Sequence, residues 1–514
     1  MSTYDYTESQ FNALLGPHVD STTLTNIDNY LISKGFFATP SSTIAINDTT
    51  GYQPVDPTAN VIAAYNPEQG ITDNSATNLI LVGPGDHFVL HGTQDVAIAI
   101  TDSGGAKVTL QDSGNDTVFV DAGASNNTIS AGAGNDTIYA ASNAGNDTYN
   151  TGTGNATIYG SSGNDTFFDG NGGNNLFVGG GGDNTMYGGS GNDTLEATGN
   201  GNNALYAGSG SETLEAGNGS DTLWGGAGND SLVGGSGDDK ITSLGSGNNT
   251  LIAGSGNSVV QSASSGNDSI QGGSGNSTLV AGTGNDTITG GTGNETLDST
   301  AGGHTTMTAA GGDNTFFVSG ASTVSMSGGS GNDTMYAAGS GNDTLVGGSG
   351  ATLMYANSGT GNDSITLNGN DTLFGSSGAD TISISGGGNQ ATLYGSTDSV
   401  TLTGAGANTL WAGSGSDTIN ASGSSGNDSF ILGSGTSSIT GGSGVNSFEV
   451  TSGAGNSTID GGSSGDNAAY FDGLASTDVT INTVGGTTTV THGADTYTLT
   501  DVQNLQFTNT DIKP

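Results

Sequence analysis

The sequence predicts an all-β fold, in which short repeats stack into a parallel β-roll or β-solenoid. The phrase Gly-Asn-Asp-Thr, or its Ser variant, recurs along the chain, as at Gly134–Thr137, Gly284–Thr287 and Gly426–Ser429. Between Thr198 and Thr242 the period is nine residues without interruption. Each unit carries an apolar residue at the same place, so stacked units can share one narrow core. We expect a small helical module before the repeats and a β-rich cap after them.

The unit Gly188–Glu196, with the sequence GGSGNDTLE, shows what each repeat has to do. Its first six residues are turn formers, and its last three favour a short strand that points Leu195 inward. The equivalent inward positions of later units are Leu205, Leu214, Leu223, Leu232 and Ile241. Two units would close a coil of about 18 residues, and a stack of some 20 coils would be a rod of roughly 95 Å.

The patterning divides the chain into regions. Helix-like spacing covers Glu8–Leu15 and Thr23–Ser33, and a stretch bearing Pro40, Pro54, Pro57 and Pro67 follows as a linker or extended cover. We expect residues 1–75 to form a helical cap or anchoring module, 76–110 the first irregular β coils, 111–466 the β-roll repeats and 467–514 a β cap.

Composition excludes several classes of partner. The chain has 514 residues, 48 of them acidic and only four basic (Lys34, Lys107, Lys240 and Lys513), with a net charge of -44. Binding to nucleic acid or to an anionic membrane depends on Lys and Arg, so neither partner is expected. A chain this acidic attracts divalent cations, which relieve the repulsion between its carboxylates.

Targeting signals are equally sparse. The first residues, MSTYDYTESQ, have no basic start and no apolar stretch, so we expect no conventional signal peptide. No apolar run reaches the length of about 18 residues that a membrane span needs. There are no cysteines, which excludes disulfides and thiolate metal sites. Export would therefore use another route.

Hydrophobic burial alone stabilises such a repeat poorly. One buried Leu contributes about 1.5–3 kcal/mol, whereas ordering the backbone costs about 1–2 kcal/mol per residue over a nine-residue unit. The aspartate at the sixth position of the unit offers a remedy, because Ca²⁺ takes six to eight oxygen ligands from carboxylates and backbone carbonyls. Aspartates on the same edge should recur every second unit, as the pairs Asp147/Asp165 and Asp221/Asp239 do. The sequence thus predicts multiple Ca²⁺ sites.

The candidate Ca²⁺ ligands are the aspartates at this sixth position: Asp116, Asp136, Asp147, Asp165, Asp193, Asp221, Asp230, Asp239, Asp268, Asp286, Asp333, Asp343, Asp363, Asp371, Asp380, Asp417 and Asp428. The alternative interpretation is that they are solvated turn residues, since Asn-Asp-Gly-Ser turns need no metal. Other units hold Asn175, Asn203, Glu212, Ser277 or Glu295 at the same place. Those turns would hold Ca²⁺ weakly or be closed by stacked Asn side chains, so we expect some loaded edges and some dry ones.

The repeats resemble those of the RTX (repeats-in-toxin) family of calcium-binding β-roll proteins, whose unit is G-G-x-G-x-D-x-U-x. The best matches are Gly188–Glu196, Gly225–Val233, Gly234–Thr242 and Gly328–Tyr336, and the resemblance extends over roughly residues 111–514. It implies export by a type I secretion system with an uncleaved C-terminal signal, followed by Ca²⁺-driven folding outside the cell. The segment Asp501–Phe507 is similar to the terminal strand region of such exported proteins.

Catalysis has little support. The match to G-x-S-x-G at Gly461–Gly465 lacks the strand–turn–helix context of a nucleophile elbow. The histidines are scattered, and the region before the repeats is too short for a typical protease or lipase domain. We expect no enzyme.

The sequence therefore predicts a secreted, Ca²⁺-stabilised structural protein that associates with other copies of itself into a surface layer, filament or biofilm matrix. Aromatic residues at the ninth position, such as Tyr187, Tyr206 and Trp224, are either ordinary strand residues or contacts for lateral packing. The alternative function is an adhesin or ice-binding rod with exposed Thr/Ser faces, for which a cell-surface glycan is a candidate partner. Lys240 and uneven unit lengths interrupt the Thr rows in the sequence.

Overall fold

A computed structural model gives the fold of the chain. It describes residues 3–514, except for 17–18, 35, 38–42, 51–60, 66–70, 73–77, 84, 102–103, 141–144, 171, 300 and 452. The proline-bearing stretch expected as a linker lies largely outside the described residues, because Pro40, Pro54, Pro57 and Pro67 all fall in these gaps. The chain forms two compact units, an N-terminal unit (Met1–Val260) and a C-terminal unit (Gln261–Pro514).

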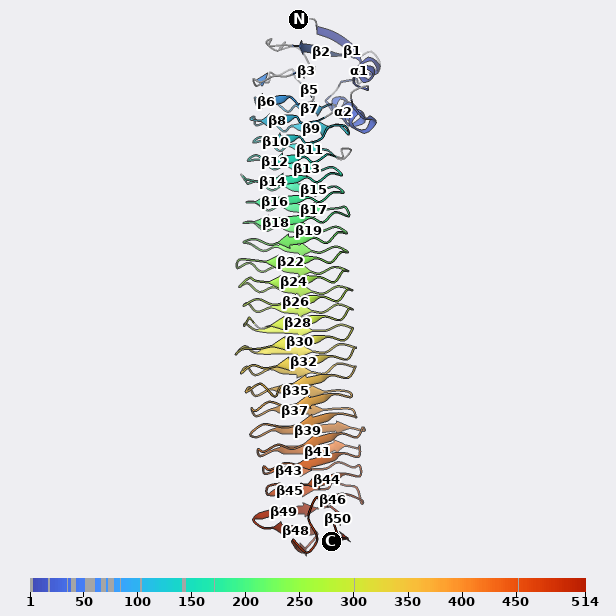
Figure 1. Cartoon of the computed structure of the whole chain (residues 1–514), viewed down its shortest axis with the longest axis vertical. Coiled ribbons are helices and arrows are strands. Elements are labelled where there is room, and N and C mark those ends of the chain that lie inside the picture. The colour runs from blue at the N-terminus through green and yellow to red at the C-terminus, as the bar shows by residue number, and fades with distance from the viewer. Residues whose placement is uncertain are drawn as a thin grey trace. The chain divides into compact units, whose positions relative to one another are not determined.

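Each unit is a parallel β-solenoid whose coils contribute a strand to each of two sheets (Figure 1). Odd-numbered strands stack on one side and even-numbered strands on the other, apart from β2 and β48, which join the odd-numbered strands, and β51, which joins the even-numbered ones; we call these the odd and even sheets. Neighbouring strands run parallel and in register, as in Leu195 beside Leu214 and Leu205 beside Leu223. The predicted all-β parallel solenoid, with helices near its start and a β-rich end, is confirmed.

The odd sheet of the N-terminal unit contains β1 (Thr3–Thr7), β2 (Thr43–Thr50), β3 (Val61–Tyr65), β5 (Leu79–Val82), β7 (Ala97–Ile100), β9 (Thr117–Val120), β11 (Thr137–Tyr139), β13 (Thr157–Tyr159), β15 (Leu176–Gly179), β17 (Thr194–Ala197), β19 (Thr213–Glu215), β21 (Ser231–Val233) and β23 (Thr250–Ile252). Its even sheet contains β4 (Ile71–Thr72), β6 (His87–His91), β8 (Lys107–Leu110), β10 (Thr128–Ser130), β12 (Thr148–Asn150), β14 (Thr166–Phe168), β16 (Thr185–Gly189), β18 (Ala204–Gly208), β20 (Thr222–Trp224) and β22 (Lys240–Ser243). The chain passes to the next unit within β24 (Val259–Ser262).

The odd sheet of the C-terminal unit contains β25 (Ser269–Gln271), β27 (Thr287–Thr289), β29 (Thr305–Thr308), β31 (Val324–Ser327), β33 (Thr344–Val346), β35 (Ser364–Leu367), β37 (Thr381–Ile384), β39 (Ser399–Gly404), β41 (Thr418–Ser424), β43 (Ser438–Thr440), β45 (Ser457–Asp460), β47 (Thr480–Val484), β48 (Thr487–His492) and β49 (Asp495–Thr500). Its even sheet contains β26 (Thr278–Val280), β28 (Thr296–Ser299), β30 (Thr315–Val318), β32 (Thr334–Ala337), β34 (Leu353–Tyr355), β36 (Thr372–Phe374), β38 (Gln390–Thr392), β40 (Thr409–Trp411), β42 (Ser429–Leu432), β44 (Ser447–Val450), β46 (Ala468–Phe471), β50 (Asn504–Gln506) and β51 (Asp511–Ile512).

The core is a column of inward side chains, one from the middle of each short strand. Leu195, Leu205 and Leu214 are completely buried, as the alternation of the repeat predicts. The residues on either side of them in each strand are partly or largely exposed, so the outer faces of both sheets consist of the seventh and ninth positions of the repeat. Parallel pairing already begins with β2, β3 and β5, ahead of residue 76 where strand-like patterning becomes clear in the sequence.

Two helices, α1 (Glu8–Leu15) and α2 (Ser21–Ser33), cover the start of the odd sheet. Their buried residues Phe11, Ile27 and Leu31 join a cluster with outward residues of the sheet, including Ala99 and Phe119. Of the residues with helical spacing, Leu14 is 41% and Ile32 46% exposed. The helices therefore use a narrower apolar face than the sequence indicated.

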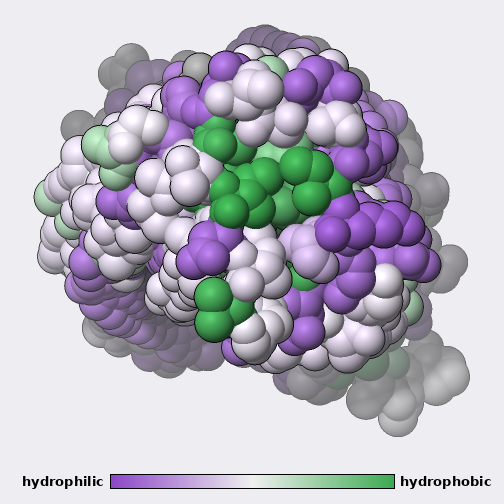
Figure 2. Space-filling view, turned by 90° about the horizontal axis from the view of Figure 1, so that it is seen from below, coloured by the Kyte–Doolittle hydropathy of each residue, from purple (hydrophilic) through white to green (hydrophobic). Residues whose placement is uncertain are grey.

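Antiparallel strands end the C-terminal unit. β49 joins the odd sheet beside β45, β48 pairs antiparallel with β49, and β47 pairs antiparallel with β48. In the even sheet, β50 lies beside β46 and pairs antiparallel with β51. Figure 2 views this end of the unit, where apolar surface gathers at the centre within a hydrophilic surround. The last strands change the pairing pattern but leave some apolar surface exposed.

Candidate functional site: carboxylate rows along the turns

In the turn before each strand, the side chain of the sixth residue points into the coil, at the edge between the two sheets. All the aspartates predicted as Ca²⁺ ligands lie at this place and are no more than 3% exposed. They are therefore not solvated turn residues. The reason is local: the glycine-rich turn closes the coil, and the strand starts at the next residue, such as Thr137 after Asp136.

Each buried carboxylate ties two coils together. Its Oδ1 atom accepts a hydrogen bond from the backbone N–H of the equivalent residue one coil earlier, as in Asp221 N–H to Asp239 Oδ1 (2.9 Å) and Asp268 N–H to Asp286 Oδ1 (2.8 Å). In several of these turns the Oδ2 atom accepts a hydrogen bond from a backbone N–H of the same turn, as in Gly226 N–H to Asp230 Oδ2 (2.8 Å). The sixth position thus builds a ladder along the edge.

A second ladder runs along the fifth position in the opposite direction. The backbone N–H of Asn135 donates to Oδ1 of Asn115 in the preceding coil (2.8 Å), and Asn155 N–H donates to Asn135 Oδ1 (3.2 Å). These side chains are exposed. The Asn-Asp phrase of the repeat is therefore a pair of hydrogen-bonding ladders, one exposed and one buried.

Glycine at the fourth position permits this close stacking. A Cβ atom on Gly134 would lie 1.6 Å from the carbonyl oxygen of Gly114 in the preceding coil, and one on Gly154 would lie 1.8 Å from that of Gly134. No side chain fits in this space. The turns are consequently held at the strand-to-strand distance, which brings the carboxylates of successive coils close together.

The structure groups the predicted residues into runs and isolates others. Direct ladder neighbours include Asp116 with Asp136, Asp147 with Asp165 and Asp221 with Asp239. A longer run joins Asp343, Asp363, Asp380, Asp398 and Asp417. Asp193, Asp333 and Asp428, in contrast, receive their ladder hydrogen bonds from Asn175, Asn314 and Asn408.

Burial without a cationic partner makes the charged state of these groups costly. Burial raises the pKa of Asp147, Asp193 and Asp239 to about 6 each. Burial, with Asp112 and Asp136 nearby, raises the pKa of Asp116 to about 9. The chain has four lysines for 48 acidic residues, so lysine cannot neutralise these rows.

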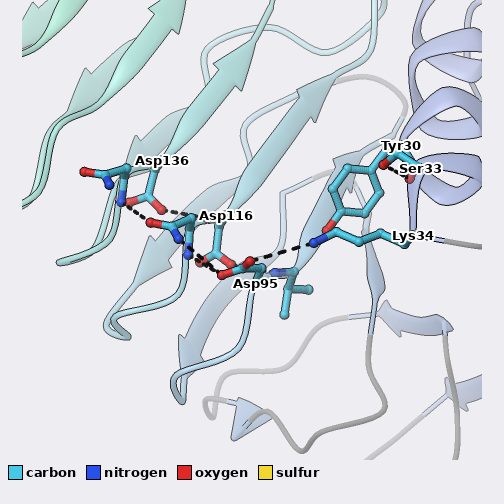
Figure 3. A network of polar contacts seen from close by, with 9 residues as sticks. Tyr30, Ser33, Lys34, Asp95, Asp116 and Asp136 are labelled. Atoms are coloured by element: carbon cyan, nitrogen blue, oxygen red, sulfur yellow. Dashed lines mark hydrogen bonds and ion pairs between the residues drawn. The ribbon is translucent and has the colours of Figure 1, made fainter.

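One lysine forms an ion pair with an aspartate outside the carboxylate rows. Lys34 of the N-terminal helical region forms an ion pair with Asp95 (Nζ to Oδ2, 3.7 Å), close to the Asp116 and Asp136 ladder (Figure 3). Asp95 is not one of the predicted ligands. The first coils thus have a cationic neighbour at their edge, while the ladder carboxylates themselves are bonded to backbone N–H groups.

Several carboxylate oxygens are left without a hydrogen-bond partner although they are buried. They include Oδ2 of Asp116, Asp193 and Asp239, and both carboxylate oxygens of Glu212 and Glu295. A buried oxygen without a partner is costly, and a hard cation that binds oxygen ligands would satisfy it. The residues present therefore fit Ca²⁺. Among the described residues, no three His, Asp or Glu side chains form a metal cluster by themselves, so the donor set would include backbone carbonyls of the turns.

Two buried aspartates of these turns are not among the ligands predicted from the sequence. Asp398 is 1% exposed and joins Asp380 to Asp417, but its short turn lacks the Gly-Asn-Asp phrase. Its distance of 18 residues from Asp380 was the available signal. Asp112, at a position where most units have glycine, is 6% exposed, and burial raises its pKa. Coil length varies too, because ladder partners are 17 residues apart for Asp363 and Asp380 and 20 for Asp116 and Asp136.

The G-x-S-x-G match at Gly461–Gly465 lies in the turn between β45 and β46. This is an ordinary solenoid turn between two strands. No helix among the described residues is long and apolar enough to cross a membrane.

Comparison with known proteins agrees with the geometry. The family described as "RTX calcium-binding nonapeptide repeat (4 copies)" matches residues 112–142, 141–168, 169–204, 206–241, 244–261, 262–297, 308–339, 325–354, 355–382, 402–423 and 422–450. These segments cover more than half of the chain. No curated protein matches it. The chain therefore belongs to the RTX family of calcium-binding nonapeptide repeat proteins, whose repeats imply Ca²⁺ binding.

Proposed function

We propose that this protein is a secreted structural β-roll that Ca²⁺ stabilises and that assembles with other copies of itself into a surface layer, filament or biofilm matrix. The observation that carries the proposal is the surface of the even sheet, where exposed aromatic residues stack from coil to coil. Tyr187, Tyr206 and Trp224 are stacked at 4.7 and 4.5 Å between ring centroids, and Tyr187 is 37% exposed. Exposed apolar surface of this kind marks interaction sites.

Ca²⁺ would be held at the carboxylate rows, by side chains such as Asp221, Asp239 and Asp363 together with backbone carbonyls of the same turns. When bound, it supplies positive charge that neutralises the buried carboxylates and links successive coils. A ligand that binds only the folded state stabilises it by about 2.7 kcal/mol at 100 times its Kd. Several such sites would make folding conditional on Ca²⁺ outside the cell.

RTX repeats are typical of secreted proteins, which supports an extracellular location. Export through a type I system, directed by the C-terminal region that includes Asp501–Phe507, is part of this proposal. The net charge of -44 supports it as well, because self-repulsion disfavours the compact state until cations are available.

The test is to follow far-UV circular dichroism and electron microscopy of the purified chain as Ca²⁺ is added. We expect β-structure to appear with Ca²⁺ and ordered assemblies to form at higher protein concentration. Monodisperse single copies at saturating Ca²⁺ would rule out assembly. A β-signal and melting temperature that chelator leaves unchanged would rule out the role of Ca²⁺.

A second candidate function, an adhesin or ice-binding surface, is favoured by the odd sheet of the C-terminal unit. Its outer face presents hydroxyl side chains at both outward positions of successive strands, as in Thr287 and Thr289 beside Thr306 and Thr308. Lys240 does not interrupt this face, because it lies in the even sheet of the N-terminal unit. Ice-recrystallisation and glycan-binding assays would test this function, and a Thr306→Tyr variant with unchanged activity in both would argue against it.

A further inference from the structure

Two aromatic ladders of similar composition lie on the even sheets, one in each unit. The first ladder consists of Phe168, Tyr187, Tyr206 and Trp224, on β14 to β20. The second ladder consists of Phe317, Tyr336, Tyr355 and Phe374, on β30 to β36. Rings of the second ladder stack with centroids 5.1–5.3 Å apart and planes within 5–6° of parallel. Phe168 and Phe317, which begin the ladders, are 46% and 39% exposed.

Both ladders are uncharged strips on a strongly acidic protein. The other outward position of the same strands holds Thr185, Ala204 and Thr222 beside the first ladder. Beside the second ladder it holds Thr334 and Leu353. Two copies of a chain with a net charge of -44 repel one another, so contact is least opposed where no carboxylate lies on the surface.

The ladders are bounded by opposite charges. After Trp224, the next even strand brings Lys240, which pairs in register with Thr222 and is exposed. Before Phe317, the preceding even strand brings Asp298, which pairs in register with Phe317 itself. Among the described residues, no carboxylate forms an ion pair with Lys240. A lysine therefore follows the first ladder, and an aspartate precedes the second.

An aromatic stack beside a Lys–Asp ion pair already occurs within the chain, where α2 packs on the odd sheet. Tyr30 of α2 contacts Phe119 edge to face with ring centroids 6.3 Å apart, and Phe119 begins a stack with Tyr139. Beside that contact, Lys34 pairs with Asp95 at 3.7 Å (Figure 3). An aromatic ladder flanked by a Lys–Asp pair is thus a docking surface within this molecule.

We propose that the first ladder of one copy packs face to face on the second ladder of another copy, antiparallel, with Lys240 beside Asp298 of that second copy. The inference rests on the proposed self-assembly and names the surface that carries it. In the antiparallel arrangement the strands of the two facing sheets run in the same direction, so aromatic column faces aromatic column. In the parallel arrangement the strands run in opposite directions, and aromatics would face the Thr column.

The antiparallel pairing also fixes which residues meet. Trp224 faces Phe317, and Tyr206 faces Tyr336. One coil further, Lys240 arrives next to Asp298. These two lie in neighbouring outward columns about 6.6 Å apart along a strand, a distance that a lysine side chain spans. Charge complementarity at this end favours the first ladder against the second over either ladder against itself.

The experiment measures self-association by sedimentation velocity at saturating Ca²⁺, with folding checked by circular dichroism. The double variant Tyr206→Ser/Trp224→Ser should weaken association at least tenfold, while the matched control Tyr394→Ser, at a position 49% exposed outside both ladders, should not. Lys240→Asp and Asp298→Lys should each weaken it, and the combined charge swap should restore it to within threefold of wild type.

A wild-type chain that stays monomeric would overturn the proposed self-assembly and this pairing with it. Assembly of wild type that is equally strong in the ladder variants, or a charge swap that restores nothing, would overturn the pairing alone. The orientation of the two copies can be tested by cross-linking. The chain has no cysteines, so a single introduced cysteine is the only site that a thiol reagent can link. Mixed Tyr206→Cys and Tyr336→Cys chains should cross-link to each other with a bismaleimide. Preferential cross-linking of Tyr206→Cys to itself would contradict the pairing of the first ladder with the second, and preferential cross-linking of Tyr206→Cys to Tyr355→Cys would contradict the antiparallel orientation.

Discussion

On the two edges of the C-terminal unit, stretches of successive turns are joined by different side chains, carboxylates on one edge and mainly amides on the other. Along the turns before odd strands, the sixth position holds Asp343, Asp363, Asp380, Asp398 and Asp417, which we call the acid edge. Along the turns before the even strands β38 to β46, the sixth position holds Asn389, Asn408, Asp428, Asn446 and Asn467, and we call this stretch the amide edge. Asp333 and Asp371 lie on the same side nearer the start of the unit.

Both edges form the same backbone-to-side-chain ladder. Asp380 N–H donates to Asp398 Oδ1 at 2.8 Å, and Asn446 N–H donates to Asn467 Oδ1 at 2.8 Å. Hydrogen bonding alone therefore does not explain why one edge is acidic. Burial of the carboxylates, with their neighbours' charges, raises the pKa of Asp363 to about 7 and that of Asp398 to about 6. An edge that carries this electrostatic cost makes sense when a cation binds there, whereas the amide edge holds a single carboxylate, Asp428, between Asn408 and Asn446.

The largest expected effect is that of removing Ca²⁺. At pH 7.5 in chelator, the acid edge keeps its negative charges with nothing to neutralise them, so we expect the largest fall in Tm and loss of part of the β-structure by circular dichroism. Mg²⁺ at the same concentration is the control, because it dehydrates reluctantly and should restore less structure. Full β-structure and an unchanged Tm in chelator would show that the hydrogen-bonding ladders stabilise both edges without Ca²⁺.

Next in size is a steric change that should affect both edges alike. A Cβ on Gly361 would lie 1.7 Å from Gly341 O on the acid edge, and one on Gly426 would lie 2.0 Å from Gly406 O on the amide edge. Both clashes are with backbone, and overpacking costs about 1–3 kcal/mol or more. Gly361→Ala and Gly426→Ala should each lower the Tm by about 5 °C or more, with and without Ca²⁺.

The control for the glycine variants is Gly465→Ala, where a Cβ meets nothing within 4 Å. Its Tm should stay within about 1 °C of wild type. A loss confined to the acid-edge variant would mean that the two edges do not share the same close stacking.

A smaller effect is expected from pH in the absence of Ca²⁺. The folded pKa of Asp363 is about 7 and that of Asp398 about 6, both above the ordinary value of 3.8. A raised pKa means that the fold favours the protonated acid, so its stabilising contribution is present at low pH and lost as pH rises through about 6–7. The Tm in chelator should therefore increase as the pH is lowered from 8 toward about 5.

With Ca²⁺ present the pH dependence should reverse over the same window, because protons compete with the cation for the carboxylates. The apparent Ca²⁺ affinity, measured by calorimetric titration, should fall as the pH drops below about 7. A Tm in chelator that decreases on acidification would contradict the raised pKa values.

The smallest effects come from exchanging single residues between the edges. Asp380→Asn removes a charge between Asp363 and Asp398, so in chelator the Tm should rise by about 2–4 °C, equivalent to about 1 kcal/mol. Asn408→Asp places a second carboxylate beside Asp428 and should lower the Tm in chelator by a similar amount. In saturating Ca²⁺, Asp380→Asn should instead lower the Tm. If both variants changed the Tm in chelator in the same direction, charge would not be what distinguishes the two edges.

Much of this architecture is predictable from local pattern. The inward position of Leu195 follows from strand alternation, and the helices α1 and α2 follow from apolar spacing. The place of Asp239 at the sixth position follows from the repeat, but its burial does not, because a solvated turn aspartate fits the same pattern. Other features are not local: Asp398 lies in a turn without the repeat phrase, and it is recognisable only as the rung between Asp380 and Asp417. The exposure of Leu14 likewise depends on which face of α1 meets the sheet.

The sequence by itself determined the repeat, the turn, the inward apolar residue and the excess of acidic over basic residues. These depend on backbone preferences and composition within a single unit, which every copy of the repeat restates. Only the tertiary structure decided which residues are ladder partners where unit lengths vary, because coils of 17 to 21 residues shift the register by amounts that no single unit records. Stacking therefore brought five acids of one edge, from Asp343 to Asp417, into an unbroken run, and it gathered Phe317, Tyr336 and Tyr355 into a ladder.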